Sequence, residues 1–93
     1  MNLSIIWTSQ FKKDYKLAIR RHLDIDLLDE VIRRLASCQP LPEKNRDHAL
    51  TGNYTGFREC HIQNDWLLIY KISGDILTLI LTRTGSHSDL FHE

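Results

Sequence analysis

Side chains that can transfer protons and bind phosphate are concentrated in the C-terminal half of this sequence. His61, Asp65, Arg83 and His87 all lie there. Histidine can act as an acid or as a base near neutral pH, and the planar guanidinium of arginine suits phosphate oxygens. RNA is cleaved without metal when a base removes the 2′-hydroxyl proton, a cation stabilises the phosphorane and an acid protonates the departing 5′-oxygen. These residue types therefore predict an RNA-cleaving site, with His61 and His87 as candidates for the proton transfers.

Two aromatic residues close to this group could stack on splayed RNA bases, an interaction worth roughly 1–3 kcal/mol per base. They are Trp66 and Phe91. Each also has a purely structural interpretation. Trp66 begins a run in which alternate residues are apolar, so for this residue alone core packing is favoured over stacking. We keep both as candidate substrate-binding residues because they accompany the proton-transfer groups.

Arg83 alternates in phase with Leu77, Leu79 and Leu81. It is therefore expected on the same strand face as an apolar row, where its charge requires a partner. An ion pair with Asp65 is the structural alternative to phosphate binding.

A zinc site is a further alternative, with ligands drawn from His48, His61, Asp65 and His87. The sequence has neither a His-x-x-x-His motif nor a paired-cysteine spacing, and a zinc site would leave Arg83 unexplained. We therefore expect no metal and no other cofactor.

Three runs rich in β-branched, aromatic and apolar residues are expected to form the strands that position these groups. They cover approximately 57–62, 66–72 and 76–84 and are separated by turn-like segments at 63–65 and 73–75. Such a pattern predicts an antiparallel meander, in which the end of the first strand, the start of the second and the end of the third meet at one edge. The side chains expected at that edge are those of His61, Asp65, Trp66 and Arg83, with His87 close behind. The meander does not place His48, which falls in the preceding loop.

Two helices are expected before the meander. The first runs from Ser9 to His22 and combines apolar residues at helical spacing with a basic outer face. The cations of that face are Lys12, Lys13, Lys16, Arg20 and Arg21. A solvated face is the simpler interpretation of such a run, but beside an RNA-cleaving site it favours phosphate binding, with Lys12, Lys13 and Lys16 as candidate contacts. The second helix covers approximately 26–38 and is ended by Pro40 and Pro42.

A short strand at 3–7 and a helical turn at 88–91 complete the expected order of elements. The 93 residues are predicted to form one domain, residues 1–93, of the α+β class. A small antiparallel sheet would carry the N-terminal helical hairpin on one face and the short C-terminal helical turn beyond its last strand.

The composition is that of an ordinary globular protein, 42% hydrophobic and 26% charged, with a formal net charge of zero. This balance argues against a uniformly basic nucleic-acid binder. The longest apolar run, 76–81, is far shorter than a membrane span, and residues 3–7 lack the basic lead of a secretion signal. We expect a cytoplasmic protein without membrane contact. Cys38 and Cys60 lack a Cys-x-x-Cys spacing and receive no chemical role.

Four segments of the chain carry a specific combination of residues. They are Asp47-His48-Ala49-Leu50, Gly56-Phe57-Arg58-Glu59-Cys60-His61-Ile62, Asp65-Trp66-Leu67-Leu68-Ile69-Tyr70-Lys71 and Arg83-Thr84-Gly85-Ser86-His87. With the two N-terminal helices they closely resemble the YafQ toxins, which belong to the RelE superfamily of bacterial type II toxin–antitoxin systems. The resemblance spans nearly the whole chain.

The resemblance implies a RelE-like fold and an mRNA endonuclease that cuts translated mRNA in the ribosomal A site and so inhibits translation. The implied partners are mRNA, the 70S ribosome with the rRNA of its 30S A site, and a DinJ-like antitoxin. The functional positions of the family carry over onto His48, His61, Asp65, Trp66, Arg83, His87 and Phe91. We expect His87 to be the general acid and Arg83 to stabilise the phosphorane. The remaining three catalytic candidates, His48, His61 and Asp65, would jointly supply the base and orient the 2′-hydroxyl.

Two other functions stay open. ParE-like proteins of the same superfamily poison DNA gyrase by binding, but they generally lack this set of histidines. A catalytically inactive relative that only binds antitoxin is the second alternative, and the intact His, Asp, Arg and His positions argue against it.

Overall fold

The computed structural model describes residues 2–74 and 78–91. In chain order its elements are β1 (Ser4–Trp7), α1 (Ser9–Arg20), α2 (Ile25–Ala36), the 3₁₀ turn η1 (Glu43–Asn45), β2 (His48–Ala49), the 3₁₀ turn η2 (Gly52–Tyr54), β3 (Arg58–Gln63), β4 (Trp66–Ser73), β5 (Thr78–Gly85) and α3 (His87–Phe91). Several predicted features fall outside the described residues. These are the turn residue Asp75 and the start of the third strand at Ile76 and Leu77.

The five strands form one sheet in the order β1-β5-β4-β3-β2. The strands β3, β4 and β5 form the predicted antiparallel meander. The sheet is not wholly antiparallel, because β1 pairs in parallel with β5. Alternation of residue types along a strand indicates which face is buried but not in which direction its neighbour runs, so the sequence pattern carried no sign of this pairing.

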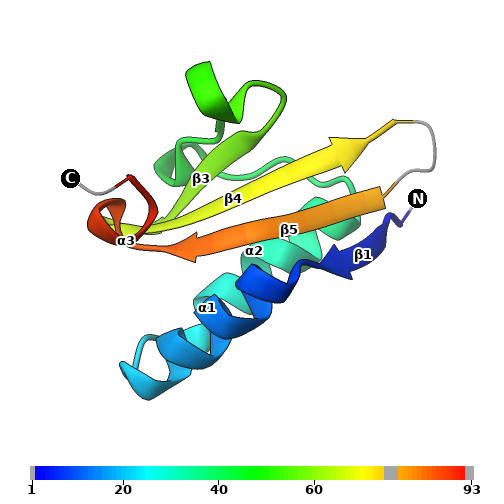
Figure 1. Cartoon of the computed structure of the whole chain (residues 1–93). Helices are drawn as coiled ribbons and strands as arrows, with labels where there is room; N and C mark the ends of the chain where they lie inside the picture. Colours follow the sequence, from blue (N-terminus) through cyan, green and yellow to red (C-terminus); the bar gives the residue numbers. More distant parts are fainter. Residues whose placement is uncertain (1, 75–77, 92–93) are drawn as a thin grey trace.

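The long helices α1 and α2 cover one face of the sheet, as predicted (Figure 1). Phe11 and Leu28 on the helices and Leu68 and Leu79 on the strands are fully buried in the core between them. Helix α1 begins at a capping residue, Thr8, whose side chain accepts a hydrogen bond from the Phe11 amide at 3.0 Å. The apolar stripes of both helices therefore supply one continuous core.

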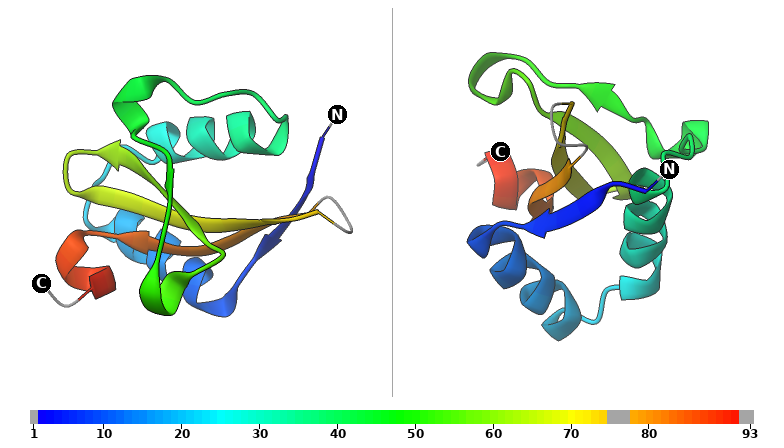
Figure 2. Two further views of the ribbon diagram at one scale, coloured as in Figure 1. Left: turned by 90° about the horizontal axis from the view of Figure 1, so that it is seen from above. Right: turned by 90° about the vertical axis from the view of Figure 1, so that its right-hand side faces the viewer.

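The opposite face of the sheet is covered only in part, by the short helix α3 and the segment between β2 and β3. Figure 2 shows the segment between β2 and β3 crossing above the strands on the side away from the two long helices. Leu67 and Ile69 of the sheet meet Leu90 of α3 in a small second cluster. The half-buried side chains that border this cluster are Leu50, Tyr54, Phe57 and Phe91. Between these short elements, the side chains of His61 and Arg83 remain partly exposed. No helix within the described ranges is long and apolar enough to cross a membrane.

Candidate active site

Strand pairing aligns the candidate residues in rows across the thinly covered face. His48 of β2 pairs with Glu59 of β3, Glu59 pairs with Ile69 of β4, and Ile69 pairs with Arg83 of β5. In the adjacent row on the same face, His61 pairs with Leu67. The short strand β2 was predicted as loop, because two residues are too few for an alternating pattern. Strand β2 places His48 at the end of the row.

Arg83 lies on the opposite face from the one predicted by its alternation with the leucines of β5. Tyr70 pairs with Leu81, whereas its neighbour Ile69 pairs with Arg83, so β5 carries one extra residue, Thr82, at this point. A bulge of this kind reverses the inward and outward alternation beyond it. Leu81 consequently packs in the helix-covered core, while Arg83 joins the row of His48 and Glu59.

His87, the first residue of α3, is held by Asp65 in the turn between β3 and β4. Its backbone N–H donates to Asp65 Oδ1 at 2.9 Å, and its ring Nδ1 lies 2.6 Å from the same oxygen. These two hydrogen bonds lower the pKa of the Asp65 carboxyl group, which therefore accepts the proton carried by Nδ1. The predicted convergence of His61, Asp65 and His87 is observed, since the rings of His61 and His87 lie 5.9 Å apart.

A buried carboxylate that was missed in the sequence lies between the other two histidines. Glu59 is only 5% exposed, and its Oε1 is 3.6 Å from His48 Nε2 and 3.7 Å from His61 Nε2. The signal that could have found it is its spacing of two residues from His61 on the same strand, which places both side chains on one face. A carboxylate between two imidazoles can orient both and stabilise whichever one is protonated.

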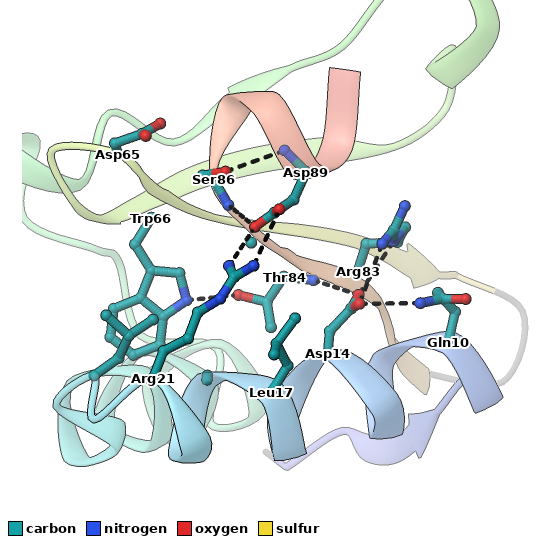
Figure 3. Close-up of a pocket in the computed structure, with 13 residues that line it drawn as sticks. Gln10, Asp14, Leu17, Arg21, Asp65, Trp66, Arg83, Thr84, Ser86 and Asp89 are labelled. Atoms are coloured by element: carbon teal, nitrogen blue, oxygen red, sulfur yellow. Dashed lines mark hydrogen bonds and ion pairs between the residues drawn. The ribbon is translucent and has the colours of Figure 1, made fainter. Parts of the chain in front are cut away.

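Arg83 forms its ion pair with Asp14 of α1, not with Asp65 as the structural alternative proposed. Its Nε donates to Asp14 Oδ2 at 3.1 Å and its Nη2 to Oδ1 at 3.1 Å. The pair raises the pKa of the Arg83 guanidinium. Beyond Trp7, strand β1 no longer covers the edge of β5, so the Arg83 side chain can reach around this edge to the helix (Figure 3).

Trp66 faces the helix-covered core and not the row of polar residues. Its side chain is 3% exposed, and its indole Nε1 donates to Thr84 Oγ1 at 3.0 Å. A base cannot stack on an indole that is covered by protein, so the substrate-binding prediction for Trp66 is corrected to core packing. The structural interpretation by strand alternation was the better one.

Phe91 and the three lysines occupy positions outside the histidine group. The half-buried ring of Phe91 lies 5.8 Å from that of Tyr54, at the border of the second cluster. Lys12, Lys13 and Lys16 are exposed on α1, as a basic outer face requires. Their contacts with RNA remain predictions.

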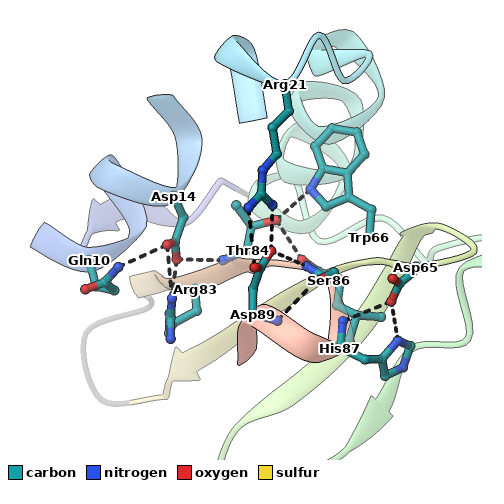
Figure 4. Close-up of polar contacts among 11 residues, drawn as sticks. Gln10, Asp14, Arg21, Asp65, Trp66, Arg83, Thr84, Ser86, His87 and Asp89 are labelled. Atoms are coloured by element: carbon teal, nitrogen blue, oxygen red, sulfur yellow. Dashed lines mark hydrogen bonds and ion pairs between the residues drawn. The ribbon is translucent and has the colours of Figure 1, made fainter. Parts of the chain in front are cut away.

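A groove of about 320 Å³ runs between α1 and the segment that joins β5 to α3 (Figure 3). Two ion pairs cross it. One is Arg83 with Asp14, and the other is Arg21 with Asp89, where Nη1 lies 2.7 Å from Oδ2. The Arg21 pair and the Ser86 amide lower the pKa of Asp89 to about 2. Figure 4 shows these contacts as one network that connects α1 with the start of α3, where His87 lies.

Three of these side chains could also hold a metal ion. Ligand atoms of Glu59, His61 and His87 all lie within 4.8 Å of one another, and two imidazoles with one carboxylate are a donor set that Zn²⁺ or Cu²⁺ accepts. A metal bound there would supply Lewis-acid chemistry and would occupy both imidazoles. The expectation of a metal-free site rested on the lack of a spacing motif, but strand pairing and the β5–α3 connection assemble this group from separate segments.

The chain resembles known toxins over almost its full length. The family model described as "Bacterial toxin of type II toxin-antitoxin system, YafQ" matches residues 3–92. The Escherichia coli K12 protein named mRNA interferase toxin YafQ is 40% identical over 88 residues, which cover 94% of each chain. YafQ in the crystal structure of the E. coli DinJ–YafQ toxin–antitoxin complex is 38% identical, with a TM-score of 0.88 and coverage of 98% and 99%. A metal-bound toxin from Helicobacter pylori is 45% identical, with a TM-score of 0.90 and coverage of 96% and 99%.

Proposed function

Because the chain belongs to the YafQ family of type II toxin–antitoxin toxins, we propose that it is a ribosome-dependent endoribonuclease that cuts translated mRNA in the A site. The observation that carries this proposal is that His61 and Arg83 lie on one sheet face, that His87 of α3 lies beside His61, and that each of the three is paired with a carboxylate. A base, an acid and a phosphate-binding cation are the three groups that metal-free RNA cleavage requires. The E. coli relatives named mRNA interferase point to the same activity.

His87 is the general acid in this proposal. Asp65 holds the ring through Nδ1, so Nε2 is the nitrogen that would deliver a proton to the departing 5′-oxygen. Asp65 therefore acts through His87, a narrower role than the joint base function expected from the sequence.

His61 is the candidate for the base, supported by Glu59. The His61 side chain is 17% exposed and so remains within reach of a substrate, whereas Glu59 is covered. Glu59 would orient His61 and stabilise the positive charge that forms when His61 takes the 2′-hydroxyl proton. His48 approaches Glu59 from the other side and would share in orienting this carboxylate.

Arg83 would bind the scissile phosphate and stabilise the phosphorane, an electrostatic contribution that is often the largest in catalysis. The site is an open face with few walls, so it cannot by itself hold flexible RNA in a reactive geometry. The ribosome would supply this orientation. Since ribosomes are cytoplasmic, we place the activity in the cytoplasm.

Lys12, Lys13 and Lys16 would contact rRNA phosphate from the outer side of α1. Replacing all three by glutamine should weaken co-sedimentation with ribosomes and flatten its dependence on salt concentration, because fewer counterions are released on binding. Co-sedimentation that stays at the wild-type level across a salt series would remove these lysines from the interface.

A DinJ-like antitoxin is the proposed protein partner. The complex of E. coli DinJ with YafQ is the precedent among the structural relatives. An antitoxin segment that covers the basic and polar surfaces would block the site. Addition of such an antitoxin should abolish cleavage.

The deciding experiment is a reconstituted translation reaction in which mRNA integrity is followed. Wild-type protein and the His87→Ala variant would be compared, each with and without ribosomes. We expect codon-phased cuts only with the wild-type protein and ribosomes. Intact mRNA in all four reactions would contradict the proposal and lead to a gyrase assay for the ParE-like alternative.

Metal-dependent hydrolysis is a second candidate mechanism, favoured by the grouping of Glu59, His61 and His87. The same translation reaction distinguishes it if purified toxin is first treated with a chelator and then returned to a reaction containing only Mg²⁺. Undiminished cleavage supports proton transfer by the histidines. Loss of cleavage that is restored by Zn²⁺ or Cu²⁺ supports the metal site.

A further inference from the structure

Asp14 is a buried carboxylate that has no place in the catalytic scheme so far. It lies on the inner side of α1 between Phe11 and Ala18, and it is 7% exposed. Its neighbours on the outer side of the helix are lysines. A buried carboxylate is costly unless it is paired and hydrogen-bonded, so its position requires a specific role.

Four donors converge on the Asp14 carboxylate. Oδ2 accepts from Arg83 Nε and from the Thr84 backbone N–H, both at 3.1 Å. Oδ1 accepts from Arg83 Nη2 at 3.1 Å and from Gln10 Nε2 at 3.0 Å. The Thr84 and Gln10 bonds fix the carboxylate, and the carboxylate fixes the plane of the guanidinium through two of its nitrogens (Figure 4).

The two-nitrogen contact determines which part of Arg83 is available to a ligand. Asp14 engages the Nε and Nη2 side, and no hydrogen bond to Nη1 is found among residues 2–74 and 78–91. Figure 3 shows the outer nitrogen of the guanidinium directed away from α1. The Arg83 side chain is 26% exposed, so this part of it can be reached from outside.

We propose that Asp14 is a positioning residue for RNA cleavage, which holds the Arg83 guanidinium so that its Nη1 side meets the scissile phosphate. The inference rests on the proposed function, because it assigns Asp14 to the phosphate-binding step of that reaction. A free arginine side chain samples many rotamers, and catalytic groups must be held close to their productive geometry to be effective. The proposed interaction also means that α1, which carries the lysines proposed to contact rRNA, sets the position of the phosphate-binding cation.

A purely structural role for Asp14 is the competing explanation. By accepting from the Thr84 amide, Asp14 also joins α1 to the open edge of β5. Stability alone cannot separate the two roles, because both predict a lower melting temperature when the carboxylate is lost. The test must therefore measure cleavage in folded protein and its dependence on Arg83.

The test variant is Asp14→Asn, which keeps the size of the side chain. An amide has one acceptor oxygen, and its NH₂ group would face donors, so the two-nitrogen contact with Arg83 cannot form. In single-turnover cleavage of ribosome-bound mRNA, we expect the rate at saturating toxin to fall at least tenfold. The toxin concentration that gives half the maximal rate should change less than threefold, because the lysines of α1 are untouched.

The matched control is Asp29→Asn, the same substitution on the neighbouring helix. Asp29 accepts a hydrogen bond from the Tyr15 hydroxyl at 2.8 Å and thereby also joins the two helices, but it does not contact Arg83. Its saturated cleavage rate should stay within twofold of wild type. An amide oxygen can still accept the Tyr15 hydrogen bond, so this control removes a carboxylate without releasing the helices. A tenfold loss here as well would indicate a general effect of lost negative charge and would overturn the proposal.

A double-mutant cycle with Arg83→Lys tests whether Asp14 acts through Arg83. Lysine keeps a positive charge but cannot make the planar two-nitrogen pair. We expect Asp14→Asn to lower the cleavage rate of the Arg83→Lys protein much less than that of wild type. Equal losses in both backgrounds, or a wild-type rate in folded Asp14→Asn, would overturn the proposal.

A spectroscopic measurement separates failure of this inference from failure of the proposed function. The Nε–H resonance of Arg83 should exchange slowly with water in the wild-type protein and rapidly in Asp14→Asn, whether or not the protein cuts mRNA. An exchange rate that is the same in wild type and Asp14→Asn would show that Asp14 does not hold the Arg83 guanidinium, and would overturn the proposal. Wild-type protein that shows the protected resonance but leaves mRNA intact would overturn the catalytic role together with the proposed function.

Discussion

The two faces of the sheet divide the protein into a region that supports the fold and a region that supports the chemistry. The face beneath α1 and α2 contains fully buried apolar side chains such as Leu68, Leu79 and Leu81. The face beneath α3 and the β2–β3 segment has a small apolar cluster, and beside it lie Glu59, His61 and Arg83.

The difference shows how a chain of this size accommodates polar catalytic groups. Charged groups are tolerated at low exposure only when they are paired. Glu59 beside His61 and Asp14 beside Arg83 are such pairs, and the more exposed His87 is paired with Asp65. Substitutions on the open face should therefore lower cleavage activity, whereas substitutions on the helix-covered face should lower the unfolding free energy.

The largest expected effect is on the open face. His87→Ala should lower the cleavage rate by about 10²–10⁴-fold, the usual contribution of a general acid. The melting temperature should change little, because the bond from the backbone of residue 87 to Asp65 does not need the side chain. Single-turnover cleavage and thermal unfolding measure the two quantities. Full cleavage by a folded variant would remove His87 from the scheme.

Leu68→Ala should show the opposite signature on the helix-covered face. Leu68 is fully buried against the helices, and truncation of a buried leucine typically costs about 2–5 kcal/mol of unfolding free energy. Denaturant titration would measure this cost. At a temperature where the variant is still folded, cleavage should remain close to wild type. A large loss of cleavage in fully folded protein would mean that the two faces are not separable.

Asp89→Asn tests the connection between the faces, because Asp89 joins α3 to Arg21 of α1. Its pKa is lowered to about 2, so the carboxylate stabilises the folded state above the unfolded-state pKa of roughly 4, and this stabilisation is lost as the pH falls towards 2. The variant should be less stable than wild type by about 1–2 kcal/mol at neutral pH, after allowance for solvent screening. Unfolding free energies measured between pH 7 and pH 2 should converge. A constant difference at every pH would exclude the ion pair as its cause.

The last of these changes, Trp66→Phe, should leave cleavage unaltered. It removes the hydrogen bond from the indole to Thr84 and leaves a small void in the core where the larger ring packed, so the unfolding free energy should fall by about 1–2 kcal/mol. Cleavage at several codons should be unchanged, because the ring lies in the core. A loss of cleavage that depends on the codon would support base stacking by Trp66. It would also mean that a residue of the helix-covered face takes part in substrate binding.

Much of the fold followed from local patterns. The apolar runs predicted β3, β4 and the end of β5 to within one or two residues, and helical spacing predicted α1 and α2. Two features could not be obtained in this way. The two-residue strand that holds His48 is too short to have a periodic pattern, and the parallel partner of β1 lies far away in the sequence.

The candidate site was predicted in its residue types and only partly in its contacts. Of the residues that the meander predicted at one edge, His61 and Asp65 meet there with His87 close behind, whereas Trp66 faces the core. The face of Arg83 was wrong because a single extra residue in β5 reverses the alternation. Asp14 and Glu59 were overlooked although each had a sequence signal: Asp14 lies at core spacing between Phe11 and Ala18, and Glu59 is in phase with His61.

The sequence by itself determined which segments form helices and strands, because these depend on periodicities within a few residues. It also determined the chemical groups available for catalysis. The tertiary structure decided which carboxylate serves which cation: Asp14 with Arg83, Asp65 with His87, and Glu59 between His48 and His61. Such pairs depend on strand register, on a bulge and on the way a helix runs along a sheet edge. These are set by packing between distant segments, which no local pattern records.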